Sequence, residues 1–62
     1  MIGFWMNKKS KTLYRVTSVG SIKIAGFWQA DALVTYHQEG FPETVYHRFI
    51  EDFEQNFKRV RG

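Results

Sequence analysis

Apolar and polar residues alternate along much of this chain in the manner of β-strands. Four segments show either a short apolar run or the period-two alternation of a half-buried strand: residues 2–6, 11–19, 32–38 and 43–48. Gly40 and Pro42 lie between the last two segments and suit a tight reversal of the backbone. The pattern therefore predicts a small antiparallel sheet that ends in a hairpin.

A short helix is predicted after the last strand, beginning near residue 48 or 49. Phe49, Phe53 and Phe57 recur at every fourth position with Ile50 beside them, which would place three rings on one helix face. A helix of about ten residues is held by packing and not by propensity, so this face should lie against the sheet. Asn56 is suited to a left-handed helix end, and Val60 is predicted to add a last short strand or to pack back on the sheet.

The middle of the chain is the least regular part. Gly20 and Ser21 are predicted to break the second strand, and Ile22 and Ile24 then alternate as a short strand or a strand-like loop edge. Gly26 permits a bend. The adjacent Phe27 and Trp28 would point to opposite faces of a strand, so at least one of them is expected to be exposed.

The expected fold class is α+β, mainly β, with four or five antiparallel strands, strongly bent or closed into a small barrel, and one short C-terminal helix. The predicted core comprises Trp5, Tyr14, Val16, Val34, Tyr36, Val45, Phe49, Phe53 and Phe57. Because Tyr14 and Val16 share one strand face, this choice leaves Arg15 outside.

Composition limits the possibilities further. The 62 residues are expected to form a single domain, 1–62, with a thin stability margin. There is no cysteine, and eleven aromatic residues supply the core area in place of disulfides. No apolar run approaches the roughly 20 residues of a membrane span, and apolar residues precede the N-terminal lysines, the reverse of a secretory signal. A soluble, cytoplasmic protein without membrane contact is expected.

Charge and exposed aromatic residues define the candidate binding site. The net charge is +3, and the first fifteen residues carry four basic residues and no acidic one. The candidate binding residues are Lys8, Lys9, Lys11, Arg15, Lys23, Phe27 and Trp28. Such cations could follow a phosphate backbone or an acidic protein surface, but lysines at a turn also simply keep an aromatic-rich protein in solution.

Catalytic residues are not indicated. There is no cysteine nucleophile and no glycine-rich phosphate loop, and a chain of this length has little room for a closed pocket of the usual ligand-site size. His37 and His47 are predicted on neighbouring strands, with only Glu39 or Glu43 nearby as a further metal ligand. We therefore expect no enzyme activity, no metal and no cofactor.

The same positions carry a resemblance. The chain is similar to a diffuse group of short, uncharacterised phage, prophage and bacterial proteins, on motifs that are short and span most of the chain: Trp5, Lys8-Lys9-Ser10, Tyr14-Arg15-Val16, Val34-Thr35-Tyr36, Tyr46, Arg48, Phe53 and Phe57. Some members follow the Arg with Pro where this chain has Phe49, which leaves the helix start open. The resemblance implies an SH3-like barrel and a phage-type origin, and no catalytic residue.

Two functions follow as expectations. The first is a non-enzymatic accessory protein, monomer or weak homodimer, that engages a host or phage protein through an aromatic and basic surface. The alternative is a small β-barrel that binds nucleic acid through the basic N-terminal hairpin and an exposed aromatic residue.

Overall fold

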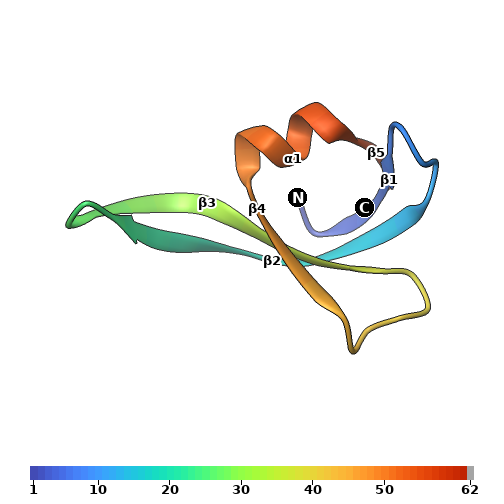
Figure 1. Cartoon of the computed structure of the whole chain (residues 1–62), viewed down its shortest axis with the longest axis horizontal. Coiled ribbons are helices and arrows are strands. Elements are labelled where there is room, and N and C mark those ends of the chain that lie inside the picture. Colours follow the sequence, from blue (N-terminus) through green and yellow to red (C-terminus); the bar gives the residue numbers. More distant parts are fainter. Residues whose placement is uncertain (62) are drawn as a thin grey trace.

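The computed structural model describes residues 1–61 and consists of one antiparallel sheet with a short helix against it (Figure 1). Along the chain the elements are β1 (Gly3–Asn7), β2 (Leu13–Ile24), β3 (Phe27–Gln38), β4 (Val45–Phe49), α1 (Ile50–Asn56) and β5 (Phe57–Arg61). The expected class, mainly antiparallel β with one short C-terminal helix, is confirmed, and the last strand around Val60 is present.

The sheet bends strongly but remains open. Its order is β4-β3-β2-β1-β5, so β4 and β5 lie at the two edges and are not neighbours in the sheet. A closed barrel, one of the forms that the sequence suggested, is therefore wrong for the described residues. The first and last strands, β1 and β5, pair with each other, which brings the two ends of the chain close together (Figure 1).

Strands β2 and β3 form a hairpin much longer than predicted. Pairing runs from Tyr14 with Gln38 to Ile24 with Phe27, and it continues past Gly20 and Ser21. The predicted break at these two residues is wrong, because irregular register between Val16 and Ser18 and between Gly20 and Ile22 absorbs the change without ending the strand.

The two hairpin turns beside β2 have local chemical causes. Ala25 and Gly26, with φ of 50° and 83°, make the two-residue loop between β2 and β3. Two positive φ values are typical of the turn type whose twist matches that of a hairpin. Before β2, the Asn7 side-chain oxygen accepts hydrogen bonds from the backbone N–H groups of Lys9 and Ser10 at 3.0 and 2.9 Å, which fixes the turn after β1.

The helix is shorter than predicted and carries one ring of the expected three. Phe49 is extended (φ −64°, ψ 146°) and precedes the helix, while Phe57 is already in β5. The predicted helical stripe of Phe49, Phe53 and Phe57 is therefore wrong as a single helix face. Asn56 does not adopt a left-handed conformation; its side-chain amide donates instead to the carbonyl oxygen of Asp52 at 2.8 Å.

The core lies between the concave face of the sheet and α1. The buried side chains are Trp5, Val16, Val34, Tyr36, Phe53 and Phe57, all of them predicted. Tyr14 is half-buried and packs against this cluster. Val45 and Phe49 are 51% and 50% exposed, so their assignment to the core is wrong. Both belong to the edge strand β4, whose outer edge pairs with no further strand in the described chain.

Candidate functional site

The far end of the β2–β3 hairpin extends beyond the core. Residues 20–31, which we call the arm, form one end of the molecule in Figure 1, and nearly all of their side chains are exposed. The buried cluster reaches only as far along these strands as Val34, with Val19 packed against it. The arm is thus a two-stranded ribbon that adds no buried side chain to the core.

The two faces of the arm differ in chemistry. Phe27 is paired with Ile24 and Trp28 with Lys23, so period-two alternation places the two aromatic rings on opposite faces, as the sequence predicts. Both rings are exposed, Phe27 to 72% and Trp28 to 69%. On the Trp28 face, the Lys23 ammonium lies 6.0 Å from the centre of the indole ring, a cation–π contact at an exposed site.

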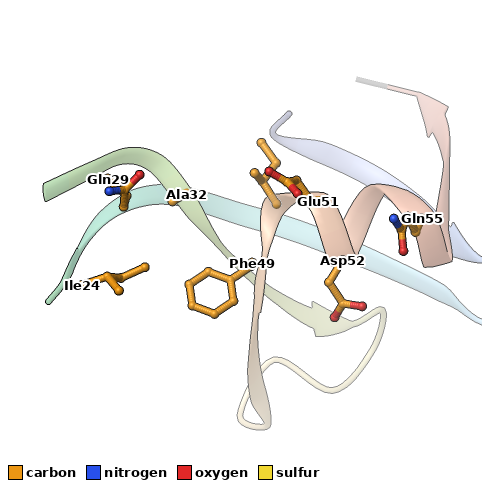
Figure 2. A pocket seen from close by; sticks show the side chains of 8 residues that line it. Ile24, Gln29, Ala32, Phe49, Glu51, Asp52 and Gln55 are labelled. Carbon is orange, nitrogen blue, oxygen red and sulfur yellow. The ribbon is translucent and has the colours of Figure 1, made fainter. Parts of the chain in front are cut away.

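The Ile24 face of the arm continues into an open groove. This groove lies between the arm and α1 (Figure 2). Its volume is about 470 Å³. Its lining residues are Ile24, Gln29, Ala32, Phe49, Ile50, Glu51, Asp52 and Gln55. Phe49 lies between the arm and the helix, and the acidic side chains come from the first turn of α1. The groove therefore has apolar walls and one acidic side.

The groove residues were not among the predicted site residues. Phe49 was assigned to the core because its spacing to Phe53 is helical, but the helix begins one residue later. The alternation of Ile22 and Ile24 indicates a strand, but it does not indicate that the Ile24 face stays uncovered. The missing signal was the length of the hairpin, since only a long β2–β3 pair places Ile24 opposite α1.

The predicted lysines of the first turn lie far from the predicted aromatic residues. Figure 1 shows the β1–β2 turn at one end of the long axis and the arm at the other. Lys8, in that turn, donates through its backbone N–H to the Asn56 carbonyl at 2.9 Å and through Nζ to the Gln55 carbonyl at 3.1 Å. It therefore ties the turn to the end of α1.

The seven predicted residues thus fall into separate groups. Lys23, Phe27 and Trp28 lie together on the arm, whereas Lys8, Lys9 and Lys11 lie in or beside the opposite turn. Arg15 is in β2 with its guanidinium 5.5 Å from the centre of the Phe4 ring. The five basic residues therefore do not form one continuous surface that leads to the two aromatic rings.

Arg48 forms a polar link between the sheet and the helix. Its Nε–H donates to the Tyr36 hydroxyl at 2.9 Å and its Nη1 to the Asp52 carboxylate at 2.7 Å, and its guanidinium lies 5.5 Å from the centre of the Phe57 ring. The hydrogen bond with Tyr36, and after it the bond with Asp52, raises the pKa of Arg48 above its ordinary value. Since arginine is charged at any working pH, Arg48 does not lose this link by deprotonation.

The described residues contain no cluster of three or more His, Cys, Asp or Glu suited to a metal ion. The two histidines lie on neighbouring strands but are not cross-strand partners, because His37 faces Val45 and His47 faces Thr35. His47 Nδ1 lies 2.9 Å from the Thr35 hydroxyl, and His37 Nδ1 donates to the Gln38 carbonyl at 2.9 Å.

Comparisons with protein-family models, with curated proteins and with solved structures found no match. Within residues 1–61, no helix has the length and apolar character needed to cross a bilayer.

Proposed function

We propose that this chain is a non-enzymatic binding protein that engages a protein partner through the arm. One observation carries the proposal: Phe27 and Trp28, 72% and 69% exposed, are the most exposed of the large hydrophobic side chains in the described chain, and they lie on a ribbon that the core does not need. Large aromatic residues are enriched at protein interfaces, where their burial supplies much of the binding free energy. A chain with so small a core gains nothing in stability from leaving them in water.

The sequence resemblance supplies the wider setting of this proposal. A cytoplasmic accessory protein of phage or prophage type, acting as a monomer or a weak homodimer on a host or phage protein, fits a small fold with a protruding recognition element. A relationship to SH3-like proteins is part of the same proposal. It is supported by the strongly bent five-stranded antiparallel sheet and the short helix placed before the last strand.

Nucleic acid is the alternative partner, and one contact favours it. Lys23 and Trp28 share a face of the arm, which combines a cation with a stacking surface in the manner of single-strand binders. The lysines of the first turn lie at the other end of the molecule, so this face offers a shorter cationic surface than the sequence suggested. The protein partner is therefore preferred.

Salt dependence separates the two functions. Labelled single- and double-stranded nucleic acids would be titrated into the protein at low and moderate salt, with binding followed by anisotropy and tryptophan fluorescence. Binding that weakens steeply with salt and quenches Trp28 would support the nucleic-acid function, because phosphate contacts release counterions. No binding at micromolar protein would remove it.

The protein-binding function is tested by chemical crosslinking and capture from a bacterial lysate. The double substitution Phe27→Ser with Trp28→Ser should abolish capture of a partner that the unchanged chain retains. Phe41→Ser is the matched control, because Phe41 is also an exposed aromatic residue (53%) but lies in the β3–β4 connection. Equal capture by all three proteins would show that the arm is not the binding element.

A further inference from the structure

One edge of β3 is open along the arm. Strand β4 pairs with β3 only from Leu33 to His37, and the chain then leaves the sheet at Phe49 to form α1. In the described part of the chain, residues 27–29 of β3 therefore pair only with β2, and Ala30 lies at the register shift that follows them. The backbone groups on this edge face the position that β4 would have filled had it continued past Phe49. An open strand edge is a template for the addition of another strand.

The groove lies beside this open edge. Gln29 and Ala32 of β3 line it together with Phe49, so a strand added along residues 27–30 would direct alternate side chains into it. Ile24 and Phe49 are 44% and 50% exposed there and supply an apolar surface on both sides. Backbone pairing and side-chain insertion are therefore both possible for one extended segment.

The charge of the groove selects the kind of segment. Glu51 and Asp52 line it, whereas none of its described lining residues is a lysine or arginine. Asp52 already has a cation, since its carboxylate accepts a hydrogen bond from Arg48 at 2.7 Å. Glu51 is the exposed acid that remains for a ligand, and it would repel phosphate and attract a basic side chain.

We propose that an extended segment of a partner protein, with apolar and basic side chains alternating on one face, adds to the open edge of β3. An apolar side chain would enter the groove between Ile24 and Phe49, and a Lys or Arg two residues along would lie against Glu51. The inference rests on the proposed protein-binding function and names the partner's chemistry. It also places the acidic groove, and not the basic first turn, at the binding site.

Two synthetic probes test the chemistry directly. One is an eight-residue fluorescein-labelled peptide that repeats Thr-Leu-Thr-Lys, and the other repeats Thr-Leu-Thr-Glu. The titrations are made at about 50 mM salt, where exposed charges are weakly screened. Addition of the protein should raise the fluorescence anisotropy of the Lys probe and leave that of the Glu probe unchanged. On binding, the alternate backbone amides of residues 27–30 that point away from β2 should gain protection from hydrogen exchange, because strand addition gives these amides a hydrogen-bond partner.

A pair of substitutions on one helix locates the charge. Glu51→Lys should lower the affinity for the Lys probe about tenfold and allow the Glu probe to bind, because the sign of the charge in the groove is reversed. Glu54→Lys is the matched control: Glu54 is exposed on the same helix but does not line the groove, and its substitution should change binding less than about twofold. Thermal melts of both variants confirm that each is folded.

Several results would overturn the inference. They are absence of binding up to about 1 mM probe, equal binding of the two probes, or equal effects of the two substitutions. Concentration-dependent self-association that Glu51→Lys abolishes would assign the groove to a second copy of this chain. If Glu51→Lys still captures the lysate partner while the Phe27 and Trp28 double variant does not, the proposed function stands and only the groove assignment fails.

Discussion

The rings of Phe53 and Phe57 stack face to face, with centroids 4.2 Å apart and planes 2° apart, although Phe53 lies in α1 and Phe57 opens β5. Trp5 and Tyr36 each form an edge-to-face pair with Phe53, with ring centroids 5.2 and 5.1 Å apart. Edge-to-face and stacked aromatic pairs contribute beyond the area that they bury. This cluster holds a helix of seven residues that is too short to be stable alone.

Phe53→Ala should remove the centre of this cluster. The side chain is fully buried, and loss of a buried Phe ring costs about 3–5 kcal/mol in the free energy of unfolding. For so small a fold that loss is a large part of the total, so the variant should be largely unfolded at room temperature. Urea denaturation followed by far-UV circular dichroism measures the change. A cooperative transition with nearly unchanged midpoint would show that the helix is not held by this ring.

Phe49→Ala should behave very differently despite its place four residues earlier. Phe49 is 50% exposed, so the substitution is expected to cost no more than about 1 kcal/mol. The same denaturation experiment compares the two variants directly. A loss of unfolding free energy as large as that of Phe53→Ala would show that Phe49 is part of the core and does not form a wall of the groove.

Tyr36→Phe isolates the hydrogen bond that links the sheet to Arg48. The tyrosine is 5% exposed and its hydroxyl accepts the Arg48 Nε–H at 2.9 Å, so its removal should cost about 0.5–1.5 kcal/mol. Tyr46→Phe serves as the comparison, since Tyr46 is 44% exposed and should be nearly neutral. Chemical denaturation of both proteins at one salt concentration is sufficient. Equal effects would show that the buried hydroxyl adds nothing to stability.

The two tryptophans should report separately on core and arm. Trp5 is 7% exposed, with its indole N–H donating to the Met1 carbonyl at 2.9 Å, whereas Trp28 is 69% exposed. Trp28→Phe should therefore leave a blue-shifted emission that acrylamide quenches poorly, with the unfolding midpoint unchanged. The unchanged chain should show an additional red-shifted, easily quenched component. Easy quenching of the Trp28→Phe variant would contradict the burial of Trp5.

Local patterns in the sequence were sufficient to predict the strands near the core. Tyr14 and Val16 were placed on the inner face, as were Val34 and Tyr36, because alternation shows which residues share a face. Phe53 was placed in the core correctly, since a ring with helical spacing to its neighbours has few other places to pack. These inferences needed only the periodicity of the side chains.

Features set by distant pairing were not predictable in the same way. Gly20 and Ser21 suggest a break, and only the cross-strand pairs on either side of Ser21, Gly20 with Leu33 and Ile22 with Gln29, keep the strand continuous. Phe49 and Phe57 have helical spacing, but β4 ends at the first and β5 starts at the second, so tertiary structure set the limits of the helix. The groove depends on both features and was therefore not anticipated.

The separation of the arm from the core has a consequence for how this chain can change over time. Substitutions near the base of the β2–β3 hairpin are restricted by the rings and aliphatic side chains packed there. Near the tip, beside Ala25 and Gly26, only the turn geometry and a bound partner impose limits. Substitutions at about a dozen positions of the arm can therefore change what the chain binds, and no compensating stabilising mutation has to occur first.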